Sequence, residues 1–377
     1  MDVDVLVQNV SAQCIPNLVA AKTYRPRRVI WIYTPETESI LKRLQQALQP
    51  MAQEVWQVNA RDSQALASVL GQRFSSLKAK GKVVYHLTGG TKSMALQGMH
   101  ALMKQADLDG VGVVMDPQSQ HFDAVLPKAM NNQTKCAELG FTEILRVHGS
   151  TRKDKSGRDM KHVVQYYDKL SKLRLWNPML MQALKDIDVC SKDQAAANQG
   201  FFYSRKKTKL SLNVRQALQL VEDMKMIKGL VFRGDQFKFQ AVGVDDAIAY
   251  IRNMWMEDWV AAVLEKHRGG QWKGGFSGVK VSIKDYHNYQ EFDFLGARKN
   301  HLVYWSCKNT REMKAEQLFE VDALRDEVGG RDFHVAGLVH TAKVKQGLQD
   351  KARRLNVALV NILENDAEER LVNISCR

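Results

Sequence analysis

Short apolar runs alternate with amphipathic segments through the first third of the chain. Residues 28–33 and 82–87 are apolar runs of strand length, whereas residues 63–77 and 92–106 place apolar side chains at helical spacing. Alternation at this rhythm is typical of a parallel sheet flanked by helices. We therefore predict a Rossmann-like α/β domain over residues 1–145, with a ligand bound where loops leave the C-terminal ends of its strands.

The pattern changes in the middle of the chain. Residues 151–158 are polar and basic, which is typical of an exposed loop. Residues 210–226 have helical spacing, and residues 230–239 form two short runs around a Gly-Asp pair, which favours a hairpin. A helix followed by a basic hairpin is how a winged-helix module ends, so we predict a helical or winged-helix-like connector over residues 146–244. Such a module either reads DNA or bridges its neighbouring domains, and the pattern allows both.

A second α/β pattern occupies the rest of the chain. Residues 291–295 and 303–308 are apolar runs separated by a turn-like segment, which predicts a hairpin. A helix is expected over residues 312–328, and further apolar runs such as residues 335–340 follow it. We therefore predict an α/β domain over residues 245–377.

The charge balance points to the kind of partner. The chain of 377 residues carries a formal net charge of +14 and has an isoelectric point near 9.5. An excess of lysine and arginine on this scale favours polyanionic partners, above all nucleic acid. The simpler alternative is a basic surface that only keeps the protein in solution.

Cysteine usage and hydropathy bear on the compartment. The five cysteines are scattered and include no CxxC pair, so neither a zinc site nor a disulfide framework is expected. No run of about 18 apolar residues occurs, and the N-terminal residues lack a basic-then-apolar signal. We therefore expect a soluble cytoplasmic protein that has no membrane partner.

Two polar loops of the N-terminal domain are candidate ligand-binding segments, and the first of them contains Ser11 and Gln13. The second follows residues 82–87 and matches neither a dinucleotide-binding GxGxxG pattern nor a Walker loop. Its paired glycines let backbone N–H groups approach a ligand closely. Lys92 opens the next helix, where its charge opposes the helix dipole, so the loop is either an anion site or a plain glycine turn capped by Thr91. The candidate residues of this second loop are Thr88, Gly89, Gly90, Thr91 and Lys92.

Charged side chains of the predicted hairpin suggest phosphodiester cleavage. Asp293 lies on the first strand and Lys308 near the end of the second, so strand pairing can bring the two together. A carboxylate beside a lysine can hold a divalent metal ion and a phosphate oxygen. Glu291 lies two residues before Asp293 and therefore points to the same sheet face, as a second metal carboxylate or as an edge charge.

Both ends of the chain resemble a known family. The loop Thr88-Gly89-Gly90-Thr91-Lys92-x-Met94 is similar to that of the CARF domain of type III CRISPR accessory proteins, and Ser11-x-Gln13 with Pro16-Asn17-Leu18 is similar to its first ligand loop. The whole chain resembles the CARF-nuclease effectors, which join this sensor to a PD-(D/E)xK nuclease with a restriction-endonuclease-like α/β fold. The resemblance implies a homodimer that binds cyclic oligoadenylate, most often cyclic tetra-adenylate, and then cleaves DNA or RNA with the help of a metal ion. It assigns ligand contacts to Ser11, Gln13, Thr88, Gly89, Gly90, Thr91 and Lys92.

The resemblance also implies roles at the nuclease site. A helix that precedes the hairpin often donates one carboxylate in this family, and Glu257 matches it, with Asp258 as a rival. Glu257 and Asp293 would then hold Mg²⁺ or Mn²⁺. Lys308 would orient the attacking water or neutralise charge on the phosphoryl oxygens.

Position 306 departs from the family pattern. The usual Glu-x-Lys or Asp-x-Lys triplet is Ser306-Cys307-Lys308 here, and a serine hydroxyl is a poor metal ligand. Three explanations are open. In the first, the acid has moved to Glu291 or to the following helix. In the second, the site is weakened or specialised in its metal, and in the third, the serine is an engineered loss of a carboxylate. The candidates in that helix are Glu312, Glu316, Gln317 and Glu320. Three classes of function stay open: a ligand-activated nuclease, a weakened or inactive effector, and a nucleotide-sensing DNA-binding regulator.

Overall fold

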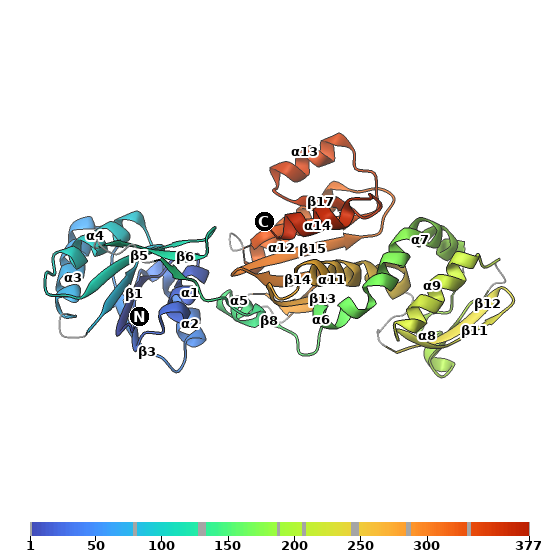
Figure 1. The fold of residues 1–377 in the computed structure, drawn as a ribbon, viewed down its shortest axis with the longest axis horizontal. Helices are drawn as coiled ribbons and strands as arrows, with labels where there is room; N and C mark the ends of the chain where they lie inside the picture. The colour runs from blue at the N-terminus through green and yellow to red at the C-terminus, as the bar shows by residue number, and fades with distance from the viewer. Residues whose placement is uncertain are drawn as a thin grey trace.

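Three parts of the molecule lie in a row along its longest axis (Figure 1). The N-terminal domain is at one end, the C-terminal domain is in the middle, and the central part of the chain is at the other end. The computed structural model of the protein describes residues 2–77, 81–126, 133–186, 189–205, 209–242, 249–283, 288–329 and 333–376.

The N-terminal domain is built on a seven-stranded sheet in the order β3-β2-β1-β4-β5-β6-β7. The first five strands in that order are parallel, and β6 and β7 are antiparallel additions. The strands are β1 (Val5–Asn9), β2 (Arg28–Tyr33), β3 (Ala52–Gln57), β4 (Val83–His86), β5 (Gly110–Asp116), β6 (His121–Leu126) and β7 (Gln133–Lys135). The helices are α1 (Ile15–Tyr24), η1 (Pro35–Thr37), α2 (Glu38–Ala47), α3 (Ser63–Ser75) and α4 (Lys92–Met103). The predicted α/β class with a largely parallel sheet is confirmed.

The C-terminal domain holds a second sheet in the order β17-β16-β15-β14-β13-β8, and β9 also pairs with β13. β13, β14 and β15 form an antiparallel meander, whereas β15, β16 and β17 are parallel. The strands are β8 (Thr151–Arg152), β9 (Arg158–Asp159), β13 (Trp272–Ser282), β14 (Tyr289–Arg298), β15 (His301–Lys308), β16 (Phe333–His340) and β17 (Ala358–Asn361). The helices are η3 (Tyr250–Met254), α11 (Trp255–Arg268), α12 (Ala315–Val328), α13 (Gln346–Arg354) and α14 (Ala367–Ser375). The predicted β14–β15 hairpin is present, with Arg298 opposite His301.

The central part packs helices on a small antiparallel sheet in the order β10-β12-β11. Its elements are α6 (Met160–Val163), η2 (Val164–Tyr166), α7 (Tyr167–Asp186), α8 (Lys192–Ala197), β10 (Phe201–Tyr203), α9 (Leu212–Asp223), β11 (Ile227–Arg233) and β12 (Gln236–Ala241). The predicted hairpin turns at Gly234, whose φ of 59° suits a residue without a side chain. α9 begins after its N-cap, Ser211. Its charged residues are one arginine and two acids, Glu222 and Asp223. That charge is unlike a basic recognition helix, so the helix does not favour DNA reading.

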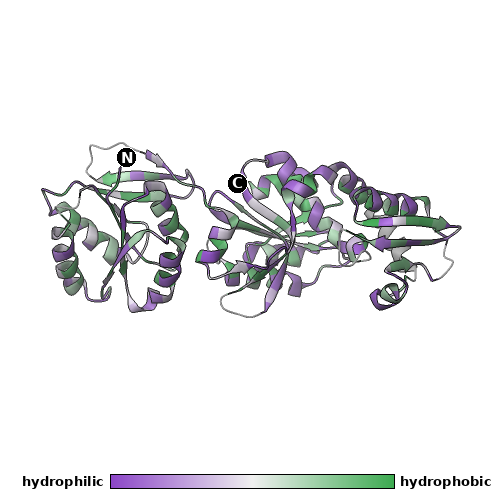
Figure 2. Cartoon of the chain, turned by 90° about the horizontal axis from the view of Figure 1, so that it is seen from below, coloured by the Kyte–Doolittle hydropathy of each residue, from purple (hydrophilic) through white to green (hydrophobic). Residues whose placement is uncertain are grey.

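The central part does not lie between the N-terminal and C-terminal domains. A connector over residues 146–244 was expected to bridge these domains, and the structure differs from that expectation. It lies on the far side of the C-terminal domain from the N-terminal domain (Figures 1 and 2). β8 and β9, within the expected connector and its predicted exposed loop, extend the C-terminal sheet because they pair with β13. Residues 243–244, where the expected boundary falls, are outside the described residues.

The C-terminal domain instead contacts the N-terminal domain directly. α5 (Phe141–Val147) packs against α2 on one side and against β13, β14 and β15 on the other. One continuous apolar cluster therefore runs from the N-terminal domain through α5 to one face of the C-terminal sheet, and a second joins the opposite face to the central part. None of the described helices is long and apolar enough to cross a lipid bilayer.

Candidate ligand and phosphodiester-cleavage sites

The two predicted ligand loops leave neighbouring strands of the N-terminal sheet. β1 pairs in parallel with β2 on one side and with β4 on the other, so the order of the strands reverses at β1. Ligands of open α/β sheets bind at such a switch point, outside the C-terminal strand ends. The loop after β1 contains Ser11, whose hydroxyl donates to the carbonyl oxygen of Gln13 at 3.0 Å. The structure therefore brings both of these residues to the same edge as residues 88–92.

Close packing against β1 explains the paired glycines of the second loop. A Cβ atom at Gly89 would overlap the carbonyl oxygen of Asn9. At Gly90 the φ is 77°, and a Cβ there would lie 2.7 Å from the Cβ of Asn9. Both positions therefore require glycine, and this leaves the backbone of the loop uncovered by its own side chains.

The two threonines of this loop are partly used by the fold. Thr91 caps α4, because its hydroxyl accepts from the N–H of Met94 at 3.2 Å. The hydroxyl of Thr88 accepts from the N–H of Met115 at 2.8 Å. The capping alternative for Thr91 is therefore present in the structure, and each hydroxyl keeps its own proton to donate to a ligand. Lys92 follows in the first turn of α4, which has no acidic residue.

The floor beneath these loops is polar and uncharged. Gln8, Asn17 and His86 are fully buried, and Asn17 donates to the carbonyl oxygen of Asn9 at 3.0 Å. Burial lowers the pKa of His86 to about 3, so its ring is neutral at physiological pH. A cation for an anionic ligand therefore has to come from the rim, where Lys92 lies.

A cavity of about 970 Å³ lies beside Thr91 at the ends of β2 and β3. Its walls are η1, residues 57–61 and the start of α3. A space of this size accommodates a nucleotide-sized group next to the glycine loop.

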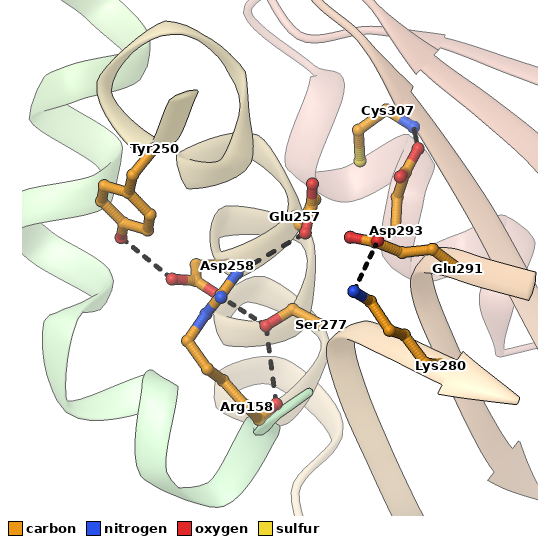
Figure 3. Close-up of polar contacts among 9 residues, drawn as sticks. All are labelled: Arg158, Tyr250, Glu257, Asp258, Ser277, Lys280, Glu291, Asp293 and Cys307. Carbon is orange, nitrogen blue, oxygen red and sulfur yellow. Dashed lines mark hydrogen bonds and ion pairs between the residues drawn. The ribbon is translucent and has the colours of Figure 1, made fainter. Parts of the chain in front are cut away.

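The hairpin site begins with Asp293 on β14. One oxygen of its carboxylate accepts from the hydroxyl of Ser306 at 3.0 Å and from the backbone N–H of Cys307 at 2.6 Å (Figure 3 includes the second bond). Ser306 therefore does not take the place of an acid; its hydroxyl orients the acid on the neighbouring strand. Lys308 is near enough to favour the charged form of Asp293, as predicted from the hairpin.

Glu257 comes from the first turn of α11 and lies beside Asp293 (Figure 3). Its side chain is buried, and a Cβ on Gly278 of β13 would lie 3.1 Å from its carboxylate oxygen. Burial, and then the negative charge of Asp293, raise the pKa of Glu257 well above its ordinary value. Burial also raises the pKa of Asp293. Two carboxylates held together against their own repulsion fit a site that a cation would stabilise.

Asp258, the rival of Glu257, is held by structural contacts. Its carboxylate accepts from Arg158 at 2.7 Å, from Tyr250 at 2.9 Å and from Ser277 (Figure 3). The guanidinium of Arg158 also lies 3.5 Å from the carboxylate of Glu257. Arg158 was missed by the sequence analysis, since it belongs to the polar stretch expected to be an exposed loop. No local pattern links it to an acid that follows about one hundred residues later.

Glu320 of α12 is the helix acid beside the hairpin site. Its carboxylate lies 3.6 Å from the ammonium of Lys308. Glu312 pairs instead with Lys345 at 3.3 Å, and Gln317 accepts from a backbone N–H at the start of α12. Of the residues considered for the missing acid in this helix, Glu320 therefore has the contact that places it at the site.

The donor set for a metal ion is a pair of carboxylates. Within the described part of the chain, no three His, Cys, Asp or Glu side chains gather as a ready metal-binding cluster. Glu257 and Asp293 offer the hard oxygen ligands that Mg²⁺ and Mn²⁺ prefer. Glu291 lies beside them, but its carboxylate is 3.6 Å from the ammonium of Lys280 (Figure 3). The buried Glu257 and the partly buried Asp293 therefore fit a divalent ion that takes its remaining ligands from water and substrate.

The turn of the β14–β15 hairpin docks into the N-terminal domain. Asn300 is 1% exposed and has a φ of 63°. Its amide donates to the side chain of Gln120 at 2.8 Å and to the carbonyl oxygen of Ala137 at 3.0 Å, and its oxygen accepts from the N–H of Leu139 at 2.7 Å. The hairpin therefore has its acid and lysine at one end and a buried contact with the other domain at its turn.

Comparison with known proteins identifies the relatives of this fold. Residues 5–136 match the family model described as the Card1 CARF domain, and no curated protein sequence matches the chain. Protein VC1899 from Vibrio cholerae has a similar structure, with a TM-score of 0.79 and 16% identity over 99% of this chain and 97% of that chain. Can2 from Sulfobacillus thermosulfidooxidans, in complex with cyclic tetra-adenylate, gives a TM-score of 0.72 and 18% identity over 99% and 100%.

A third structure is a type III CRISPR defence DNA nuclease activated by cyclic oligoadenylate. It gives a TM-score of 0.55 and 15% identity, over 98% of this chain and 52% of that chain. At such identities these likenesses concern the fold. The arrangement of all three parts of the chain is therefore similar to that of VC1899 and Can2, and its N-terminal domain is similar to the Card1 CARF domain.

Proposed function

We propose that this protein is a cyclic oligoadenylate sensor joined to a metal-dependent nuclease of type III CRISPR antiviral defence. In this proposal cyclic tetra-adenylate binds the N-terminal domain and activates cleavage of DNA or RNA by the C-terminal domain. The Card1 CARF match, the ligand of Can2 and the named activity of the CRISPR DNA nuclease support it. The observation that carries it is the β14–β15 hairpin, because Cys307 on it holds the proposed metal ligand Asp293, and Asn300 at its turn contacts the domain that carries the ligand loops.

Two copies of the N-terminal domain would hold the ring. Four phosphodiesters carry four negative charges, which suits two glycine loops and two copies of Lys92 related by a two-fold axis. α4, which begins with Lys92, exposes Leu96 and Met103 at 70% and 62% of their surfaces. Apolar side chains this exposed on the helix behind the ligand loop support a homodimer that buries α4 and brings the two loops together.

The metal ion would be held by Glu257 and Asp293. When bound, Mg²⁺ or Mn²⁺ polarises the scissile phosphate and lowers the pKa of a bound water. The protein contributes fixed ligands, since Asp293 is oriented by Ser306 and Cys307, and Glu257 is supported by Arg158.

Lys308 and Glu320 complete the proposed chemistry. The ammonium of Lys308 neutralises negative charge that develops on the phosphoryl oxygens. Glu320 holds that ammonium and supplies the acid that is missing at Ser306. About half of its side-chain surface is exposed, so it can turn toward a metal-bound water without breaking a buried contact.

The test is cleavage of labelled single-stranded DNA and RNA by the full-length protein, with and without cyclic tetra-adenylate and Mn²⁺. We expect cleavage only when both are present, and none from Asp293→Ala, which loses its metal ligand. Unchanged ligand binding by that variant would show that it is folded. If the wild type ignores cyclic oligoadenylates, or Asp293→Ala still cuts, the proposal is wrong.

A weakened effector is the second candidate, and Ser306 is the observation that favours it. A carboxylate at 306 would sit within reach of Asp293, as the serine hydroxyl does now. If the site is weakened, Ser306→Glu should raise ligand-stimulated cleavage by an order of magnitude or more, since one added ligand strengthens metal binding. If Glu320 already serves, the same change should leave cleavage equal or lower.

A further inference from the structure

A second cavity opens in the C-terminal domain, one strand away from Lys308. It has a volume of about 710 Å³ and lies between α13 and the C-terminal ends of β16 and β17. β15 and β16 run in parallel and pair Lys308 with His340, which lines the cavity. Neighbouring strands are about 4.8 Å apart, so the cavity begins one strand from Lys308 and two strands from Asp293 on β14. We call this space the α13 pocket.

The walls of the α13 pocket combine apolar and basic side chains. The apolar members are Ala342, Val344, Ala352, Val357, Ala358 and Leu359. The lining also contains Lys343, Arg353 and Arg370 against one acid, Glu364, with which Arg370 forms an ion pair. The side chain of Arg353 is 72% exposed and forms an ion pair with Asp350 in its own helix, a surface contact that a ligand can replace. The pocket therefore suits a ligand that has a flat apolar part and a negative charge.

The wall of the pocket contains a polar atom that lacks a hydrogen bond. His340 is 3% exposed, and its Nδ1 has no hydrogen-bond partner among the described residues. Burial lowers the pKa of His340 to about 4, although a backbone hydrogen bond with Ala342 opposes the shift, so the ring is neutral, with one nitrogen that donates and one that accepts. A buried polar atom without a partner is uncommon, and a ligand bearing donors and acceptors is one way to satisfy it.

The position of the pocket favours a strand that also passes Lys308. The loops that follow β15 and β16 are tied together, since the hydroxyl of Thr341 donates to the carbonyl oxygen of Thr310 at 2.8 Å. α13 ends with Lys351, Arg353 and Arg354, and in Figure 1 it stands clear of both the N-terminal domain and the central part. A polyanion can therefore reach the pocket and Lys308 together.

We propose that the α13 pocket binds one nucleotide of the substrate strand, next to the nucleotide whose phosphodiester is cut. The base enters between the apolar wall and His340, and the phosphate contacts Lys343 and Arg353. This inference rests on the proposed nuclease function and names a site that the carboxylate pair does not include. In this proposal the pocket contributes to substrate affinity and to the selection of substrate.

The experiment measures binding of a fluorescent single-stranded oligonucleotide to full-length protein carrying Asp293→Ala, with cyclic tetra-adenylate and Mn²⁺ present. In that background Lys343→Ala/Arg353→Ala should weaken binding about tenfold and reduce the slope of affinity against salt by about two charges. The matched control Lys42→Ala/Arg73→Ala also removes one exposed lysine and one exposed arginine, from α2 and α3 of the N-terminal domain, and should change neither quantity. Equal binding by both double variants would overturn the proposal.

A second variant separates the base from the phosphate. Ala358→Phe narrows the pocket on the half-buried strand β17 and should weaken binding of an ordinary oligonucleotide without changing the salt slope. An oligonucleotide with abasic sites should bind this variant and its parent equally. If Ala358→Phe affects ordinary and abasic strands alike, the pocket does not hold a base, and the proposal is wrong.

Two further outcomes separate this inference from the function on which it rests. If the variants bind normally and cut normally in the wild-type background, the pocket proposal fails while the nuclease proposal stands. If no form of the protein binds or cuts nucleic acid, both fail. A nucleoside monophosphate that raises the melting temperature of the protein but not of Ala358→Phe, with oligonucleotide affinity unchanged, would assign the pocket to free nucleotides and overturn the strand proposal.

Discussion

The two candidate sites differ in the chemical groups that would contact a ligand. At the N-terminal site the backbone is the functional surface: Gly89 and Gly90 pack so tightly on Asn9 that no side chain fits, and the buried floor is uncharged. At the C-terminal site the functional groups are acidic side chains: burial, and then the charge of Asp293, raise the pKa of Glu257, and burial raises the pKa of Asp293. The first site is therefore suited to an anion and the second to a cation, and the β14–β15 hairpin connects the second site to the domain that holds the first.

The largest effect is expected from the one cation of the backbone site. Lys92→Ala should reduce affinity for cyclic tetra-adenylate by about a hundredfold, because a two-fold ligand loses two charge contacts of more than 1 kcal/mol each. The matched control is Lys42→Ala, at an exposed position of α2, which should bind as the wild type does. Isothermal titration calorimetry measures both. Equal affinities would mean that the loop is a structural turn and not an anion site.

This contrast also accounts for what could be read from the sequence. A backbone site depends on adjacent residues, so residues 88–92 were recognisable as a motif. The hairpin was predictable because its two apolar runs are neighbours in the chain, and Asp293 and Lys308 came with it. The rest of the second site comes from distant elements. Arg158 and Glu320 reach it only through tertiary packing, and no spacing in the sequence encodes that packing.

The placement of the central part illustrates the same limit. Its helices and hairpin were visible as periodic patterns, yet sequence order suggested a connector between the N-terminal and C-terminal domains. Its position depends on which face of the C-terminal sheet offers an apolar surface, and α11 supplies that surface. The contact between the N-terminal and C-terminal domains comes from α5, from Asn300 in the hairpin turn and from the ion pair of Lys273 with Glu138.

Asn300 is the residue whose substitution should uncouple ligand binding from cleavage. Asn300→Ala removes three hydrogen bonds to the N-terminal domain and leaves the buried N–H of Leu139 without its acceptor, so it should uncouple the domains and cost about 1–3 kcal/mol in unfolding free energy. We expect unchanged affinity for cyclic tetra-adenylate but a loss of about tenfold in its stimulation of cleavage. Lys299→Ala, at the exposed position beside it, is the control. If Asn300→Ala is stimulated as strongly as Lys299→Ala, activation does not pass through the hairpin turn.

An effect of similar size is expected at the edge of the charged site. Glu320→Gln should lower the cleavage rate by about tenfold or more, since the ion pair with Lys308 is lost and the acid proposed to replace position 306 is removed. Glu316→Gln makes the same chemical change one turn earlier on α12, at an exposed position, and should cleave at the normal rate. Single-turnover kinetics at saturating Mn²⁺ separate the chemical step from metal binding. Identical rates for the two variants would mean that Glu320 does not replace the acid missing at position 306, and would favour the weakened-effector interpretation.

The smallest expected effect is on stability, and it tests directly whether the second site is strained by its own charges. Because the pKa of Glu257 is raised in the folded protein, the metal-free protein carries no penalty from this group at pH values below 4.5, the ordinary value for glutamate. The penalty grows as the pH rises from there toward the raised pKa. Glu257→Gln removes it and leaves Arg158 paired with Asp258 at 2.7 Å.

We therefore expect Glu257→Gln to stabilise the metal-free protein by about 1 kcal/mol at neutral pH and by nothing in acid. Urea unfolding in the presence of a chelator, at acidic and neutral pH, measures the difference. Adding Mn²⁺ should reverse the order, because the ion binds the folded wild type and stabilises it, whereas the amide is a poorer ligand. A variant that is less stable than the wild type without metal would mean that Arg158 already compensates Glu257. The carboxylate pair would then be a structural salt-bridge network, and the contrast between an anion site and a cation site would be lost.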